Sequence, residues 1–253
     1  MTGDPVSDAL RVLDLIGVFA NAMLGGVIAR TARLDVLGFA TLAILSGVGG
    51  GIIRDVLLQH GTPAALTDYA YVPTAVAGAL VVYLIRIEGP IWDRVWPYVD
   101  ALALGCWAAA GAQKTLVVGL GWLPAVLLGA VTAVGGGFTR DVVLRRVPAI
   151  LGGNTLYATC ALVAGGVMVV MYRAGLPIAG SAVATVTGAG LCLLARWQKW
   201  VLPQGDEWSA LGAARARLAR RTRPRRRRRT ASPGGSRQGS GDLGTPTGRS
   251  EEE

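Results

Sequence analysis

Long apolar stretches alternate with short polar connectors along most of this chain. Seven stretches hold roughly 20 mostly apolar residues, enough for a helix to cross about 30 Å of hydrocarbon. The connectors between them carry Gly, Pro or charged residues. The pattern predicts an all-α membrane protein with seven transmembrane helices, near residues 10–29, 35–58, 69–87, 97–116, 121–144, 154–172 and 178–198.

Residues from Pro203 onward differ in composition, being rich in Arg, Gly, Ser, Pro and Thr, with Arg225 to Arg229 in a row. A segment of this kind cannot bury a core, so we expect a disordered tail over 203–253. The Arg run favours contact with anionic lipid. We expect no nucleic-acid partner, because no fold or aromatic platform accompanies the run.

The charge balance supports a membrane protein and suggests its orientation. Only 16% of the residues are charged, whereas soluble domains carry about a quarter. If the C-terminus is cytoplasmic, most Lys and Arg residues fall on inside loops and the tail, as the positive-inside rule requires. Seven spans then place the N-terminus outside. We therefore expect a multi-pass protein of the cell (plasma or inner) membrane.

The sequence matches itself at an offset of 86 residues. The segment Val48-Gly-Gly-Gly-x-x-Arg-Asp-Val56 falls on Val134-Gly-Gly-Gly-x-x-Arg-Asp-Val142 without a gap. Each unit holds three spans, an odd number, so the second unit must be inverted relative to the first. We predict a first three-helix repeat at 1–89, an inverted second repeat at 90–175, a seventh transmembrane helix at 176–202, and the tail.

Each repeat carries a glycine triplet within its second span. A glycine in a helix costs about 1 kcal/mol relative to Ala, and three together permit a kink or a break that exposes backbone carbonyls. The alternative is close packing of neighbouring helices. The matching positions in both halves favour a functional kink at Gly49, Gly50, Gly51, Gly135, Gly136 and Gly137.

An Arg-Asp pair follows each triplet by about one helical turn. A charge at bilayer depth costs at least roughly 2.5–3.5 kcal/mol, so it normally faces a cavity or a partner. Two-fold symmetry favours cross-repeat pairing of Arg54 with Asp141 and of Arg140 with Asp55. Such pairs would line a pore or lock the two halves together, and the residues leave both roles open.

Further polar residues lie inside the predicted spans. Asp14 and Asp100 occupy equivalent positions in the first and fourth spans. Lys114 follows in the fourth span; facing inward it would repel cations and plug a pore, whereas a side chain that snorkels to the interface would only anchor the helix. The uncharged residues that either line a wet path or bridge helices are Asn21, Ser46, Thr132 and Gln113.

Catalytic and metal chemistry find little support in the residues. The chain has one His, His60, and three widely spaced Cys residues inside apolar runs. No Ser/His/Asp set accompanies them. We therefore predict neither an enzyme nor a metal site, and we expect Cys106, Cys160 and Cys192 to be small buried residues.

Paired G-G-G-x-x-R-D motifs, a three-plus-three duplication and a seventh helix together resemble the prokaryotic branch of the trimeric intracellular cation channel family, over about residues 8–200. The resemblance implies a homotrimer, with a pore in each subunit between the two repeats and kinks of the second and fifth helices at the triplets. It implies K⁺ and, less selectively, Na⁺ as permeant ions. It implies no cofactor, and a bound lipid is compatible with it. In this resemblance Lys114 matches the basic gating residue, and the Arg-rich tail has no counterpart.

Two other classes of function remain open on the sequence. This domain type has also been labelled a glycine transporter, and an inverted repeat suits a secondary carrier for a small zwitterion. Arg and Asp side chains would supply the partners for its carboxylate and its amine. A non-transporting membrane scaffold is the third reading, although it needs no symmetric intramembrane charges.

Overall fold

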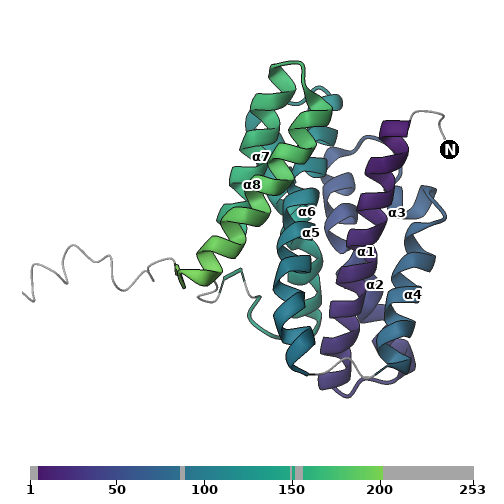
Figure 1. Ribbon diagram of the computed structural model, residues 1–253. Helices are drawn as coiled ribbons and strands as arrows, with labels where there is room; N and C mark the ends of the chain where they lie inside the picture. The colour runs from purple at the N-terminus through teal and green to yellow at the C-terminus, as the bar shows by residue number, and fades with distance from the viewer. Residues whose placement is uncertain (1–4, 86–88, 149, 152–155, 202–253) are drawn as a thin grey trace, which may run out of the picture. The chain divides into compact units, whose positions relative to one another are not determined.

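The computed structural model describes residues 5–85, 89–148, 150–151 and 156–201. The predicted tail over 203–253 lies outside the described residues. Within them the chain is all-helical, and each of the seven predicted spans overlaps one helix (Figure 1). The helices are α1 (Pro5–Thr31), α2 (Val36–Leu58), α3 (Ala64–Thr67), α4 (Tyr71–Leu84), α5 (Pro90–Val117), α6 (Trp122–Val143), α7 (Tyr157–Arg173) and α8 (Pro177–Trp197).

Helix boundaries follow local capping signals. The Asp35 carboxylate accepts a hydrogen bond of 2.7 Å from the backbone N–H of Gly38 and so caps the start of α2. Gln59 ends that helix with a left-handed backbone, φ 49°. Pro90 and Pro177 occupy the first positions of α5 and α8, where a missing N–H costs nothing.

Three helices depart from the predicted ranges. Helix α1 begins at Pro5, before the predicted start at residue 10. The four-residue α3 lies in a connector that the apolar pattern reads as a loop. Helix α5 begins at Pro90, several residues before the predicted start at residue 97, because its first turns contain Asp93 and Arg94 and are too polar to count as a span.

The helices pack in two groups, one for each repeat. In the first repeat α1 packs against α2 and α4, and in the second α5 packs against α6 and α7. Helices α2 and α6 form the main contact between the groups, α1 also packs against α5, and α8 packs against α5 and α7. Much of the interior is alanine, including Ala22, Ala43, Ala108 and Ala164, and such small residues let helix backbones approach closely.

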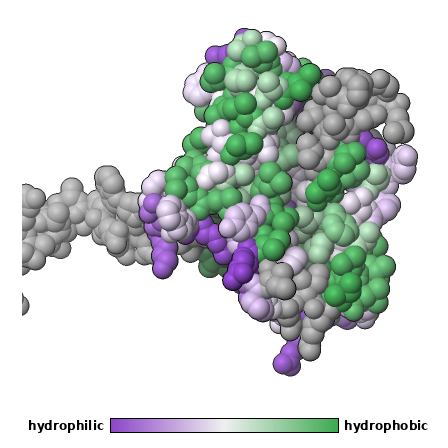
Figure 2. All heavy atoms as spheres, in the orientation of Figure 1, coloured by the Kyte–Doolittle hydropathy of each residue, from purple (hydrophilic) through white to green (hydrophobic). Residues whose placement is uncertain are grey.

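Large apolar side chains cover the outer flanks of the helices, as Figure 2 shows for one face. Four helices are apolar and long enough to cross a membrane, at Asp14–Thr31, Val36–Leu58, Trp122–Val143 and Pro177–Trp197; α4 and α7 are shorter apolar helices. Exposed residues on these flanks include Leu57, Leu80, Leu127, Val170 and Val186. A surface of this kind is typical of a protein that faces lipid.

An ion pair outside the candidate spans ties α1 to the connector before α4. The Arg11 guanidinium donates two hydrogen bonds to Asp68, at 2.5 and 2.7 Å. The hydrogen bonds from Arg11 lower the pKa of Asp68 to about 2, from an ordinary value near 4. Because the folded-state pKa is depressed, the ion pair stabilises the fold fully above about pH 5 and loses this effect as the pH falls from 4 to 2.

We therefore expect Asp68→Asn to lower the melting temperature of the detergent-solubilised protein at neutral pH. The difference from the unsubstituted protein should shrink as the pH is lowered from 4 to 2. Melting curves of both proteins across this range measure it. A difference that stays constant down to pH 2 would contradict the assignment of the stabilising charge to Asp68.

Candidate functional site

The two glycine triplets meet where α2 crosses α6. A Cβ on Gly50 would lie against the carbonyl oxygen of Thr132, and a Cβ on Gly136 against that of Ser46, both far inside van der Waals contact. The contact is reciprocal, because exchanging the two repeats maps each half of it onto the other. Both helices run through their triplets without a break.

Of the two distortions that three glycines permit, a break is therefore absent from both helices. Gly50 and Gly136 serve the close packing that was the alternative interpretation, and a kink at the triplets stays a prediction. The third glycine of each triplet behaves differently: a Cβ on Gly51 would have only Arg54 Nη2 within 4 Å, at 3.8 Å, and one on Gly137 would approach Arg140 Nη2 at 3.6 Å.

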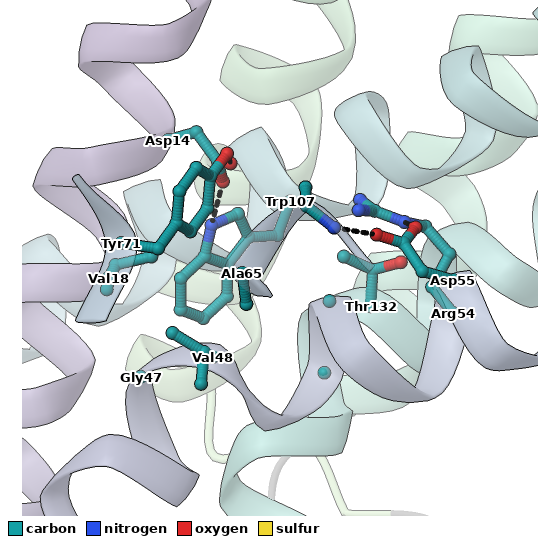
Figure 3. Close-up of a pocket in the computed structure, with 13 residues that line it drawn as sticks. Asp14, Val18, Gly47, Val48, Arg54, Asp55, Ala65, Tyr71, Trp107 and Thr132 are labelled. Carbon is teal, nitrogen blue, oxygen red and sulfur yellow. Dashed lines mark hydrogen bonds and ion pairs between the residues drawn. The ribbon is translucent and has the colours of Figure 1, made fainter. Parts of the chain in front are cut away.

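One recess in the protein lies beside the first triplet, and we call it recess 1 (Figure 3). It holds about 370 Å³ of empty space, part of it open to solvent. Its polar lining residues are Asp14, Arg54, Asp55, Tyr71, Trp107 and Thr132.

Asp55 is the centre of the charge cluster in recess 1. Its carboxylate accepts hydrogen bonds from Arg54 Nε at 2.7 Å, Lys114 Nζ at 2.8 Å and the backbone N–H of Ala64 at 2.9 Å. The Asp55 side chain is 4% exposed and the Lys114 side chain 36%. Lys114 thus faces inward, so its reading as an interfacial anchor is wrong, and three donors hold the buried carboxylate.

A second recess, recess 2, lies beside the other triplet. It is larger, with about 940 Å³ of empty space including open solvent, and its polar lining residues are Asn21, Asp100, Arg140, Asp141, Tyr157 and Arg196. Arg140 Nε donates to Asp141 Oδ1 at 2.9 Å. The buried Arg140 Nη1 has no hydrogen-bond partner in the part of the chain that the structure describes.

Each arginine bonds the aspartate that follows it in the sequence. The pair expected between Arg140 and Asp55 is therefore wrong among the described contacts: Arg140 bonds Asp141, and Asp55 bonds Arg54 and, from the other repeat, Lys114. Adjacent residues on a helix point about 100° apart, but the arginine side chain is long enough for its Nε to turn back to the neighbouring carboxylate.

Asp14 and Asp100 also occupy equivalent sites. The hydroxyl of Tyr71 donates to Asp14, and that of Tyr157 donates to Asp100 at 3.0 Å. Asp14 has a further donor, the indole N–H of Trp107, at 2.8 Å. Figure 3 shows the rings of Tyr71 and Trp107 both directed at this carboxylate. Each aspartate ties the first helix of its repeat to the third.

The uncharged candidates divide between the two expected roles. Gln113 bridges helices, since its Oε1 accepts a hydrogen bond of 2.8 Å from Ser181 in α8. Thr132 lines recess 1, and Asn21 lines recess 2. Ser46 lies at the helix crossing, where its buried hydroxyl has no hydrogen-bond partner among the described residues.

Trp107, Tyr71 and Tyr157 are site residues that the sequence reasoning did not select. The 86-residue repeat could have identified them, because it aligns Tyr71 with Tyr157 and Trp107 with Asn21. The expected small buried cysteines are found at Cys160 and Cys192, whereas Cys106 is only half-buried. No group of three or more His, Cys, Asp or Glu side chains suited to a metal ion occurs within the described ranges.

Comparison with known proteins agrees with this geometry. A family model described as glycine transporter matches residues 11–86 and 97–173. A UPF0126 membrane protein of Deinococcus radiodurans is 34% identical over 205 residues, which cover 79% of this chain and 94% of that protein. The UPF0126 inner membrane protein YadS of Escherichia coli K12 is 34% identical over 161 residues, 63% of this chain and 77% of YadS.

Solved structures with the same fold are cation channels. A structure described for conductance through TRIC cation channels superposes with a TM-score of 0.71 at 32% identity, covering 77% of this chain and 96% of that chain. The trimeric intracellular cation channel orthologue from Rhodobacter sphaeroides gives a TM-score of 0.68 at 27% identity, covering 75% and 98%. The relatives and the helices together identify a multi-pass membrane protein.

Proposed function

Since this chain belongs to the glycine transporter family and is related to prokaryotic trimeric intracellular cation (TRIC) channels, we propose that it is a monovalent cation channel. The observation that carries the proposal is the pair of charged recesses on either side of the α2–α6 crossing. Each recess contains an ionised pair at the end of a glycine triplet. A scaffold would have no use for such costly, symmetrically placed charges in apolar helices.

The pathway runs between the two repeats of one subunit, from one recess past the crossing to the other. Polar groups line this route: Thr132 in recess 1, Asn21 in recess 2, and the unpartnered Ser46 hydroxyl between them. A buried hydroxyl without a partner costs free energy, which a passing water or ion would recover. Small movements of α2 against α6 at Gly50 and Gly136 would then open or close the route.

Further properties follow from the same proposal. We infer an inverted three-plus-three arrangement with α8 as the seventh transmembrane helix, the N-terminus outside and the C-terminus cytoplasmic. K⁺ and Na⁺ are the permeant ions, and the subunits form a homotrimer in the cell membrane, as the name of the related trimeric channels suggests. The Arg-rich tail contacts anionic lipid. No catalytic role or cofactor is proposed.

A secondary carrier for glycine is the second candidate. The name of the matching family model favours it. Recess 2 also offers both ends that a zwitterion needs, the Arg140 guanidinium for a carboxylate and the Asp100 carboxylate for an amine. Proteoliposomes that accumulate glycine against a gradient would distinguish this carrier from a channel.

Lys114 provides a test of the pathway. Its ammonium bonds Asp55, a residue that lines recess 1, and from there it repels cations and holds the closed state. A partly exposed ion pair contributes up to about 1 kcal/mol, so Lys114→Ala should raise K⁺ efflux from proteoliposomes roughly fivefold. Lys114→Arg keeps the charge and should conduct like the unsubstituted protein. Equal efflux from all three proteins would place Lys114 outside the pathway.

A further inference from the structure

The two recesses are counterparts of one another under exchange of the repeats, yet they differ in size. Most lining residues of recess 1 correspond to lining residues of recess 2 at the 86-residue offset. The corresponding pairs include Asp14 and Asp100, Val48 and Val134, Gly51 and Gly137, Arg54 and Arg140, Asp55 and Asp141, and Tyr71 and Tyr157. The empty space is about 370 Å³ in recess 1 and about 940 Å³ in recess 2.

One exchanged position places a large side chain in recess 1 and a small one in recess 2. Trp107 projects from α5 into recess 1, and its counterpart Asn21 projects from α1 into recess 2. The indole is 6% exposed, packs against Gly17 so closely that a Cβ there would lie 2.9 Å from Nε1, and bonds Asp14. A tryptophan side chain is far larger than an asparagine side chain, so it fills the space that Asn21 leaves open.

A second exchanged position lies on the same face of α5. Lys114 follows Trp107 by seven residues, two helical turns, and its counterpart in recess 2 is the apolar Ile28. One face of α5 thus holds two side chains that bond the aspartates of recess 1, Trp107 on Asp14 and Lys114 on Asp55. A displacement of this helix would break both contacts together.

We propose that Trp107 is a one-sided gate: it closes recess 1 while recess 2 stays open to the aqueous phase. The inference rests on the proposed channel function and adds a gating residue that acts on a different aspartate from Lys114. Removing the indole takes away one of the two donors to Asp14, leaving Tyr71, and widens recess 1. Asn21 performs no such closure, so access to the pathway is asymmetric although the repeats are symmetric.

The test compares two introduced cysteines in matched surroundings. Gly51→Cys and Gly137→Cys place a thiol beside the equivalent arginines of recess 1 and recess 2, and neither Cβ clashes. Each protein is treated in detergent with a cationic methanethiosulfonate reagent. Mass spectrometry of the labelled peptides measures the labelling rate of each cysteine separately, so the native cysteines need not be removed. If recess 1 opens only transiently, Gly137→Cys in recess 2 should react at least about tenfold faster than Gly51→Cys in recess 1.

Substitution at the gate should then move one rate and not the other. Trp107→Asn should raise the Gly51→Cys rate about tenfold or more and leave the Gly137→Cys rate unchanged. Asn21→Trp should slow Gly137→Cys. Trp107→Phe keeps an aromatic ring but removes the indole N–H, and it should leave the Gly51→Cys rate slow. If Trp107→Asn does not fold, Trp107→Phe takes its place. A fast Gly51→Cys rate in Trp107→Phe would show that the hydrogen bond to Asp14, and not the ring, closes recess 1.

Two results would overturn the proposal. Equal labelling of Gly51→Cys and Gly137→Cys in otherwise unsubstituted protein would show that recess 1 is open. A Gly51→Cys rate that stays slow in folded Trp107→Asn would show that another group closes it. The labelling rates do not depend on ion conduction. A protein that passes no current would therefore contradict the proposed channel function, whereas the difference in labelling between the two recesses would stand as a separate result.

Discussion

Replacing Asp55 by alanine is expected to lower the free energy of unfolding by about 3–5 kcal/mol, the largest effect of any substitution considered. The carboxylate is almost fully buried and accepts from Arg54, Lys114 and the backbone of Ala64. Its removal leaves the buried Arg54 guanidinium without an anion. Equilibrium unfolding in mixed micelles measures the loss.

Two variants bracket this result. Asp35→Ala removes an exposed carboxylate that caps the same helix, and it should cost only about 1 kcal/mol. Arg54→Met with Asp55→Leu removes the buried pair together and should recover most of the stability, because an apolar pair of similar volume needs no desolvation. If Asp55→Ala cost no more than Asp35→Ala, the cluster would be solvated and recess 1 would be wider than the structure indicates.

Substituting the middle glycine of either triplet is expected to destabilise the protein by about 1–3 kcal/mol or more. A Cβ on Gly50 would lie under 3.0 Å from the Thr132 carbonyl oxygen, and one on Gly136 equally close to that of Ser46. Both obstacles are backbone atoms, so α2 and α6 must separate. We expect Gly50→Ala and Gly136→Ala to melt at a lower temperature, measured by size-exclusion chromatography of heated samples. We also expect both variants to lose K⁺ flux, measured by efflux from proteoliposomes.

The neighbouring glycine provides the matched control. Gly51→Ala adds the same methyl group where only Arg54 Nη2 lies within 4 Å. The substitution removes a helical glycine, which favours the helix by about 1 kcal/mol. It should therefore leave the melting temperature unchanged or raise it. Equal loss at Gly50 and Gly51 would mean that the triplet acts through helix flexibility and not through the crossing.

The helices could be predicted from the sequence because lipid imposes a simple rule. A span must be apolar over a fixed length, and every predicted segment coincides with a helix. The rule is silent about polar helix ends, so it missed the first turns of α5. It is equally silent about α3, which is too short to produce an apolar period.

The site could be predicted only in part. The repeat singled out the residues that flank the α2–α6 crossing, but it could not decide between close packing and a functional kink. Packing depends on how closely the two backbones approach. It also could not give the direction of Lys114. Symmetry suggested cross-repeat ion pairs, whereas the short path from Arg54 Nε to the adjacent carboxylate decides the pairing.

Departures from the repeat proved as informative as its matches. The apolar pattern does not distinguish Trp107 from other aromatic residues in the spans. Its alignment with Asn21, however, marks a position at which the two recesses differ. Lys114 aligns with Ile28 in the same way. In a duplicated membrane protein, an unequal pair at equivalent positions is therefore a direct pointer to asymmetric function.

The most direct test of the central claim is the reversal potential of the purified protein in planar bilayers under a KCl gradient. A cation channel should give unitary current steps that reverse near the K⁺ equilibrium potential. Bilayers that stay silent with folded protein, together with proteoliposomes that accumulate glycine against a gradient, would contradict the channel and establish the carrier instead.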